Sequence, residues 1–178
     1  MDDVPGRVLI LTGPPGSGKT TIARLVAARL DRAVHVESDA FFHFIEAGFI
    51  EPWRTEAHEQ NQVVMGIVGE VASGYAKAGY PTIVEGILVP GWFYEPLRDR
   101  LQRDDLQVTT AILRPSPAIS VMRARERSSN PLTDPAVVEQ VGRGFAELGS
   151  LERLVIDNEA EGPDATAEAV FDLWTSPT

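Results

Sequence analysis

The segment at residues 13–20, Gly-Pro-Pro-Gly-Ser-Gly-Lys-Thr, constrains the fold of this chain more than any other feature. It fits the pattern GxxxxGK[ST], directly follows the apolar run 7–12 and directly precedes a helical pattern at 20–30. In such a strand–loop–helix unit, glycines let successive backbone N–H groups point at phosphate oxygens, the lysine reaches the β/γ-phosphates and the threonine hydroxyl ligates Mg²⁺. The unit predicts an α/β fold with a phosphate-binding loop at 13–20. The alternative is a glycine-rich turn without a ligand.

Short apolar runs alternate with helical patterns along the rest of the chain. Strands are expected at 7–12, 33–37, 81–85, 107–113 and 153–157, and helices at 20–30, 56–78, 93–103, 117–127, 135–148 and 165–174. No repeat or linker interrupts the alternation, so residues 1–178 are expected to form a single domain. Strands that alternate with helices of ten or more residues predict a parallel sheet covered on both faces.

The longest expected helix, 56–78, carries an unbroken apolar stripe. Its members are Val63, Val64, Ile67, Val68, Val71, Ala72, Tyr75 and Ala76. Residues three or four apart share one helix face, and such a face is typical of a helix that packs on a core.

The acidic balance of the chain restricts its partners. Lys and Arg number 16 and Asp and Glu 26, so the formal net charge is −10. Proteins that bind duplex nucleic acid usually carry a basic footprint, so we expect no nucleic-acid partner, and any anion site has to be local. Without cysteine, disulfides and cysteine-ligated metals are excluded, and His35, His43 and His58 lack zinc-ligand spacing.

The sequence also predicts no membrane contact. No run approaches the ~18 apolar residues of a membrane span, and the acidic N-terminus is unlike a signal peptide. We therefore expect a cytoplasmic protein.

Two acidic residues lie at the ends of expected strands. Asp39 follows the strand 33–37, and Glu85 ends the strand 81–85. Ligands of open α/β folds bind at the C-terminal edge of the sheet, so either carboxylate can orient a metal-bound water, with Thr20 on the metal itself. Asp39 can instead accept the proton of an acceptor hydroxyl. The alternatives are a helix cap for Asp39 and a purely structural role for Glu85.

Four arginines lie close together, at Arg114, Arg123, Arg125 and Arg127, before the polar stretch 128–134. Arg123 and Arg127 are four residues apart and share one helix face. We expect a lid at about 123–135 whose arginines stabilise a phosphoryl group in transfer. A solvated helix face, with Glu126 as ion-pair partner, is the alternative.

A stretch that mixes aromatic and polar residues follows Asp39. We interpret residues 39–62 as the acceptor region, because aromatic walls with few polar groups are typical of small-molecule sites. The candidate contacts are Asp39, Phe42, Arg54, His58, Gln62 and Glu85. Ordinary packing is the alternative, above all for Phe41, Phe44 and Ile45. Asp157 and Asn158, at the end of the last expected strand, either edge an adenine ring or form a plain turn.

With these residues in view, the chain resembles the small P-loop kinases related to gluconate kinase, shikimate kinase, chloramphenicol phosphotransferase and the zeta toxins. It is most similar to a bacterial branch of that group. The segments that carry the resemblance cover most of the chain and are GPPGSGKTTIA, SDAFFHFIEAGFIEPW, HEQNQVVM, YAKAGYPTIVEGIL and LTDPAVVEQVGRGFAELG.

The resemblance implies the P-loop NTPase fold, with strand order 2-3-1-4-5. It also implies ATP and Mg²⁺ at residues 13–20, Asp39 at the acceptor hydroxyl, and Arg123 and Arg127 over the phosphates. The acceptor does not carry over, because residues 41–53 do not resemble the gluconate, shikimate or chloramphenicol pockets.

The leading hypothesis is an ATP-dependent phosphotransferase that acts on the hydroxyl of a small molecule, as a monomer or homodimer. Its expected catalytic residues are Lys19, Asp39, Arg123 and Arg127, and its expected metal site is Thr20, Asp39 and Glu85. The alternatives are a zeta-toxin-like or nucleotide-directed kinase and a non-catalytic ATP-sensing module. The expected nucleotide contacts are Gly13, Pro14, Pro15, Gly16, Ser17, Gly18, Lys19, Thr20, Thr21 and Asn158.

Overall fold

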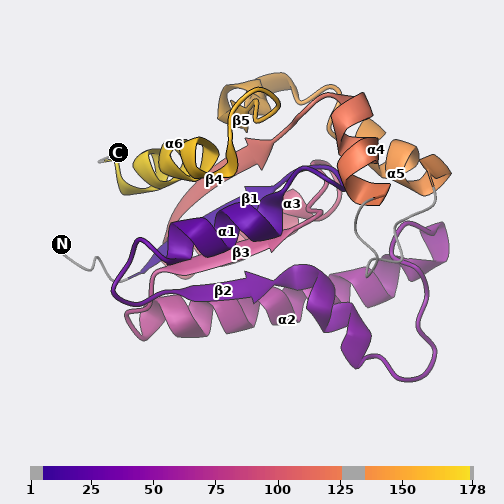
Figure 1. Cartoon of the computed structure of the whole chain (residues 1–178). Helices are drawn as coiled ribbons and strands as arrows, with labels where there is room; N and C mark the ends of the chain where they lie inside the picture. Colours follow the sequence, from indigo (N-terminus) through magenta and orange to yellow (C-terminus); the bar gives the residue numbers. More distant parts are fainter. Residues whose placement is uncertain (1–5, 126–134, 177–178) are drawn as a thin grey trace.

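Five parallel strands form one sheet in the part of the chain that the computed structural model describes, residues 6–125 and 135–176 (Figure 1). The strands are β1 (Arg7–Thr12), β2 (Val34–Glu37), β3 (Thr82–Gly86), β4 (Gln107–Leu113) and β5 (Val155–Ile156). Their order, β2-β3-β1-β4-β5, confirms the predicted order. Because all paired neighbours run parallel, the C-terminal ends of the strands meet at one edge of the sheet.

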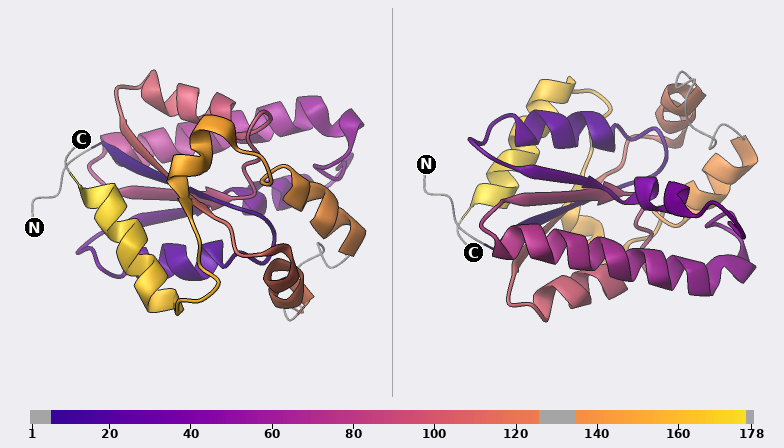
Figure 2. Two further views of the ribbon diagram at one scale, coloured as in Figure 1. Left: turned by 90° about the horizontal axis from the view of Figure 1, so that it is seen from above. Right: turned by 90° about the horizontal axis from the view of Figure 1, so that it is seen from below.

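Helices cover both faces of the sheet, as Figure 2 shows. On one face α1 (Lys19–Ala27) packs beside α6 (Pro163–Thr175), and on the other α2 (His58–Lys77) packs beside α3 (Tyr94–Gln102). Helices α4 (Pro117–Arg125) and α5 (Pro135–Arg143) lie beyond the C-terminal edge of the sheet. Short 3-10 segments are η1 (Ser38–Phe44), η2 (Thr55–Ala57) and η3 (Gly149–Leu154). Among the described residues, no helix has both the length and the hydropathy to cross a membrane.

The central strand β1 requires both helical layers. Val8 and Ile10 belong to the core on the α2–α3 side, and Leu9 and Leu11 belong to the core on the α1–α6 side. All four side chains are fully buried, and each stabilises the fold by about 1.5–3 kcal/mol. A strand buried on both faces needs a continuous apolar run, and residues 7–12 have that pattern.

The apolar stripe of α2 is only partly buried. The members that pack against the sheet are Val64, Val68, Ala72 and Ala76. Val63, Ile67 and Tyr75, by contrast, are 63%, 45% and 45% exposed. The stripe is wider than the line along which a helix touches a sheet, so these three residues lie on its uncovered flank.

The C-terminal part departs most from the expected boundaries. Helix α5 ends at Arg143 rather than at 148, because from Gly144 to Ala146 each backbone N–H donates to the carbonyl three residues back. The strand expected at 153–157 is reduced to Val155–Ile156, since residues 153 and 154 belong to η3. Helix α4 is described to Arg125, and the remaining residues expected in it, 126 and 127, lie outside the described part.

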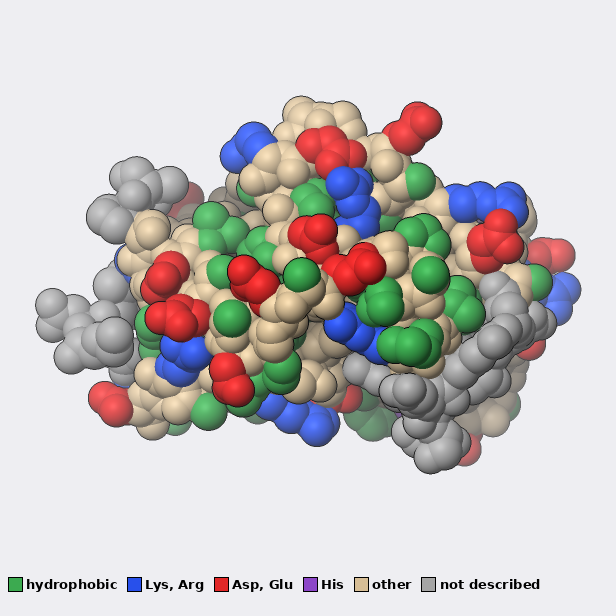
Figure 3. Space-filling view, turned by 45° about the horizontal axis from the view of Figure 1, so that its top comes forward, with side chains coloured by type: hydrophobic (Ala, Val, Ile, Leu, Met, Phe, Trp, Pro, Cys, Tyr) green, Lys and Arg blue, Asp and Glu red, His purple; other side chains and the backbone are tan. Residues whose placement is uncertain are grey.

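Charged side chains are spread over the face of the molecule that Figure 3 shows, within its described part. On the face shown in Figure 3, the described Lys and Arg side chains lie singly among acidic and apolar ones. This face has no extended basic patch in its described part.

Candidate active site

The loop between β1 and α1 has the backbone of a phosphate cradle. Gly18 precedes α1 with a φ of 90°, a left-handed conformation that residues with side chains rarely adopt. At Gly13, a side chain would collide with the carbonyl oxygen of Leu113 on β4. The backbone path therefore requires both glycines, and it sets the N-terminus of α1 at the C-terminal edge of the sheet, where an anion is favoured.

Lys19 is buried and bends back over this loop. Its ammonium group donates to the carbonyl oxygens of Gly13 (3.0 Å) and Pro14 (3.1 Å) and lies 3.4 Å from the Ser17 hydroxyl. Its charge also opposes the rise in the pKa of Asp39 and helps to lower the pKa of Glu85. The loop thus holds a desolvated positive charge where phosphate oxygens would lie.

Thr20 and Glu85 tie α1 to the end of β3. The Thr20 hydroxyl donates to Glu85 Oε1 over 2.8 Å, and Glu85 is buried. Burial by itself would raise the pKa of Glu85, but the His35 ring, the Lys19 ammonium and the Thr20 hydroxyl together hold that pKa below its ordinary value. Glu85 is therefore a carboxylate at neutral pH.

His35 and Glu37 join Glu85 in a group that sequence reasoning did not find. Parallel pairing sets Glu37 beside Glu85, and His35 Nε2 lies 3.7 Å from Glu85 Oε1. One ligand atom from each of the three residues lies within 4.8 Å of the others, so the group can hold a divalent cation. The period-two spacing of His35 and Glu37 on β2 was the signal available in the sequence.

Asp39 lies in η1, directly after β2. Its side chain is open to solvent inside a recess whose walls displace much of the surrounding water. That desolvation, opposed by Lys19 and reinforced by the charge of Glu85, raises the pKa of Asp39 to about 6. The residue that precedes η1 is Glu37, so Asp39 is not the cap of a helix.

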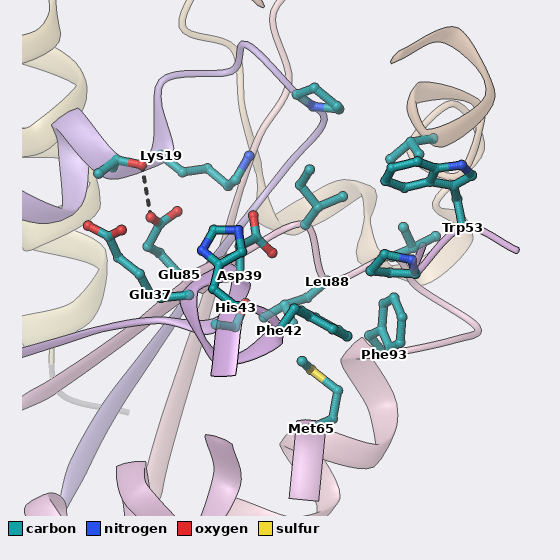
Figure 4. Close-up of a pocket in the computed structure, with 18 of the residues that line it drawn as sticks. Lys19, Glu37, Asp39, Phe42, His43, Trp53, Met65, Glu85, Leu88 and Phe93 are labelled. Atoms are coloured by element: carbon teal, nitrogen blue, oxygen red, sulfur yellow. Dashed lines mark hydrogen bonds between the residues drawn. The ribbon is translucent and has the colours of Figure 1, made fainter. Parts of the chain in front are cut away.

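A cavity of about 860 Å³ extends from the phosphate loop (Figure 4). Lys19, Glu37, Asp39 and Glu85 gather at one end, and apolar side chains line the other. The larger apolar residues among them include Phe42, Phe49, Trp53, Met65, Leu88, Val89, Trp92, Phe93 and Val141. They come from the 39–53 stretch, α2, the segment after β3 and α5, so the cavity assembles segments that are distant in the sequence.

Only some of the predicted acceptor residues line this cavity. Phe42, Asp39 and Glu85 do, whereas Arg54, His58 and Gln62 do not. Arg54 is exposed and lies 3.6 Å from both Glu51 and Glu56. His58 and Gln62 are exposed on α2. Sequence reasoning missed Leu88, Trp92 and Phe93, because nothing local shows that the segment after β3 turns toward the loop.

Asn158 contacts the phosphate loop through its side chain. Its amide donates to the Ser17 carbonyl over 2.8 Å, and its side chain is buried. Arg123 reaches the carbonyl oxygen of Asn158 at 3.4 Å, which places this arginine beside the loop. Asp157 accepts a hydrogen bond from the Glu159 N–H, as in a plain turn. Arg127 lies outside the described residues.

Arg114 has a structural role. Its guanidinium donates to both carboxylate oxygens of Glu152, at 2.9 and 2.7 Å, and to the Phe145 carbonyl at 3.2 Å. Arg114 and Arg123, the two arginines of the cluster with described side chains, therefore contact different parts of the molecule.

Residues 8–148, most of the chain, match the AAA domain family. The chain belongs to this family. The boundaries of the match run from β1 to the residues after α5, so the phosphate loop, Asp39, Glu85 and the cavity all lie within the AAA domain.

Solved structures share the fold of this AAA domain. The tunicamycin resistance protein of Deinococcus radiodurans is 19% identical with a TM-score of 0.70, covering 93% of both chains. A gluconokinase from Sinorhizobium meliloti 1021 is 15% identical, with a TM-score of 0.63 over 93% of this chain and 91% of that one. Shikimate kinase from Acinetobacter baumannii is 19% identical, with a TM-score of 0.64 over 94% and 92%. At these identities the likeness confirms the fold expected from the small P-loop kinases.

Curated relatives match a much shorter part. ABC transporter G family member 36 of Arabidopsis thaliana is 37% identical over 65 residues, 36% of this chain and 4% of the transporter. The chain therefore spans 4% of the length of the curated relatives it matches.

Proposed function

We propose that this AAA-domain protein transfers the γ-phosphoryl group of ATP to a hydroxyl of a small molecule. The observation that carries the proposal is the convergence of Lys19, Thr20 and Asp39 where the phosphate loop opens into the cavity. A phosphate cradle beside a carboxylate and a large cavity suits transfer to a second ligand, whereas ATP sensing alone needs no acceptor cavity. The structural likeness to a gluconokinase and a shikimate kinase supports it at the level of fold.

Thr20 and Glu85 fit a Mg²⁺ ion at the phosphates. Mg²⁺ prefers oxygen ligands, and here an ionised carboxylate and a hydroxyl lie 2.8 Å apart beside the loop. Thr20 would hold the ion, and Glu85 or Asp39 a water on it. When bound, Mg²⁺ neutralises charge on the β- and γ-phosphates.

Asp39 is the group we assign to the acceptor. Its carboxylate takes the proton of the acceptor hydroxyl, whose oxygen forms a bond to the γ-phosphorus as the bond to the β–γ bridging oxygen breaks. The products are a phosphate ester and ADP, and Asp39 then returns its proton to water. A pKa near 6 makes Asp39 a stronger base than an ordinary aspartate.

The reaction also needs positive charge around the phosphates. Lys19 and the loop N–H groups bind the phosphates, and Arg123 lies beside the loop. We propose that Arg123 and Arg127 stabilise the transferring group, a role that can be worth ~10³–10⁵ in rate. Because the reaction needs ATP and Mg²⁺, we place the enzyme in the cytoplasm. We expect it to act as a monomer or homodimer.

The two lysines of the chain provide a matched test. Lys19→Ala is expected to abolish ATP turnover, because the β/γ-phosphates lose their only lysine, while the thermal unfolding midpoint stays near that of the wild type. Lys77 is the control, because it is the last residue of α2, away from the loop, and its ammonium contacts Asp104 at 3.0 Å. Lys77→Ala should keep full turnover. Turnover is measured as ADP release with a panel of sugars, sugar acids, nucleosides and antibiotics. Near-wild-type turnover in Lys19→Ala would contradict the assignment.

A further inference from the structure

We propose that the acceptor presents an apolar ring beside its hydroxyl and carries no negative charge. This inference rests on the phosphotransfer proposed above and names its substrate class. The walls, the charges and the size of the cavity each support it.

The end of the cavity away from the phosphate loop is an apolar wall (Figure 4). Phe42, Met65 and Leu88 are almost fully buried there. Trp92 and Phe93 also line it, with their rings stacked at 4.3 Å between centroids and 16° between planes. Burying apolar ligand surface against such a wall is favourable, and flat rings favour a flat partner.

The charges along the cavity are mainly negative. Its titratable lining residues are Glu37, Asp39, Glu51, Glu85, Lys19, Arg24 and His43, and Glu51 also lies 3.6 Å from Arg54. Lys19 belongs to the phosphate loop, and Arg24 contacts Glu37 at 3.2 Å. Among the described residues that line the apolar end, none is a lysine or an arginine.

An anionic acceptor is therefore expected to bind weakly. Its carboxylate or phosphate would lose water near the carboxylates of Asp39 and Glu85 without gaining a described lysine or arginine at the apolar end. An amine would be attracted by these two carboxylates and by the aromatic faces. An uncharged alcohol would be neither attracted nor repelled by the carboxylate charges.

The size of the cavity points to a ring-bearing acceptor rather than a very small alcohol. At about 860 Å³, a volume that includes the phosphate end at Lys19 and Thr20, it lies in the upper part of the range of about 300–1,000 Å³ for drug-sized ligands and leaves room for a ring beside the phosphates. A small sugar alcohol would leave the apolar wall in contact with water, so burial of that wall would not contribute to binding.

Three probes with the same phenyl ring and a hydroxyl test this inference: phenylalaninol (a cation), 3-phenylpropane-1,2-diol (uncharged) and 3-phenyllactate (an anion). Binding without ATP is read from tryptophan fluorescence, since Trp53 and Trp92 line the cavity while Trp174 is buried in the α6 core. We expect phenylalaninol and the diol to bind more tightly than phenyllactate by about tenfold or more. Glucose, which has no apolar ring, should bind more weakly than the diol. Binding of phenyllactate or glucose as tight as that of the diol overturns the inference.

Product formation is measured separately, by mass, after adding ATP and Mg²⁺. The binding order decides the inference on ligand class, and the presence of any phosphorylated product, from the probes or from the wider panel, decides the proposed function. The two failures are therefore distinguishable.

Variants of one wall residue check that the probes occupy this cavity. Trp53→Ala should weaken phenylalaninol binding by about tenfold, and Trp53→Phe should restore most of it because the aromatic face returns. Phe44→Ala is the control, since Phe44 is an aromatic residue of η1 that is 76% exposed and does not line the cavity. Unchanged binding in Trp53→Ala, or an equal loss in Phe44→Ala, overturns the inference.

Discussion

Asp39 and Glu85 are two carboxylates beside one phosphate loop whose pKa values move in opposite directions. Glu85 is buried but has the Thr20 hydroxyl and the His35 ring as partners, so it stays ionised. Asp39 loses water to the cavity walls with less compensation, and its pKa rises to about 6. Two carboxylates separated in this way suit two roles, a fixed anion near the metal and a base at the acceptor.

The pKa of Asp39 predicts a pH profile. As a base, Asp39 acts only when ionised, so kcat/KM should fall as the pH drops below about 6, where the free protein takes up one proton. Initial rates between pH 5 and 8 at low acceptor concentration measure this. Replacement of the aspartate by asparagine should lower the rate and remove the inflection, and an inflection that persists in that variant would assign it to another group.

The raised pKa of Asp39 also affects the stability of the fold, and this effect is favourable at low pH. Because the pKa of Asp39 is raised above its ordinary 3.8, the folded state binds this proton more tightly than the unfolded chain does. The stabilisation is present below pH 3.8 and is lost as the pH rises through about 6. Asp39 is thus most useful as a base in the pH range where it stabilises the fold least.

Asp39 and Glu85 were predictable from the sequence, whereas their partners were not. An acid that follows a short apolar strand beside a phosphate-binding loop is a local pattern. The meeting of Glu37 with Glu85 depends on the pairing of β2 with β3, segments 45 residues or so apart, and no local signal sets that register.

At the scale of elements, the site depends on how closely η1 passes β3. A side chain at Gly86 would collide with the Ser38 hydroxyl and would lie 3.1 Å from Ser38 Cβ and 3.5 Å from Asp39 Oδ1. The absence of a Cβ at Gly86 therefore lets η1 bring Asp39 to the edge of the sheet.

Gly86→Ala is expected to destabilise the fold by about 1–3 kcal/mol and to lower activity, because η1 and Asp39 must move away from β3. Denaturant unfolding and turnover measure the two effects. In Gly74→Ala, at an exposed α2 position with open space around it, the same methyl group should stabilise by about 0.5–1 kcal/mol and leave turnover unchanged. Equal stability of Gly86→Ala and the wild type would show that η1 does not need this close approach.

The elements also show why the acceptor region was predicted in part. The range 39–62 does contribute Phe42 and Trp53 to the cavity. On α2, however, Met65 faces the cavity whereas Gln62, three residues earlier, is exposed. The orientation of α2 depends on how the loop before it packs, and Asn61 anchors that loop through the Pro52 carbonyl at 2.8 Å. Such long-range packing has no signature in periodicity.

For the whole molecule, strand alternation and a phosphate loop were enough to predict a parallel sheet with two helical layers, and the resemblance to the small P-loop kinases supplied the strand order. The apolar runs are long enough to identify buried strands, and short connections leave few topologies. The C-terminal part was harder, since β5 has only two residues and follows a 3-10 segment. The net charge of −10 predicts that any anion site is local, and Lys19 and Arg123 are described cations that contact carbonyl groups of the loop or of Asn158 beside it.

Transfer of a labelled γ-phosphoryl group from ATP tests the central claim most directly, with the wild type and Asp39→Asn measured in parallel against the same acceptor panel. The account predicts a phosphorylated acceptor and one ADP per transfer with the wild type. It predicts unchanged ATP affinity for Asp39→Asn, with a rate lower by about 10²–10⁴ because the base is lost. A wild-type protein that binds ATP and phosphorylates no acceptor, or an Asp39→Asn variant with an undiminished rate, would contradict it.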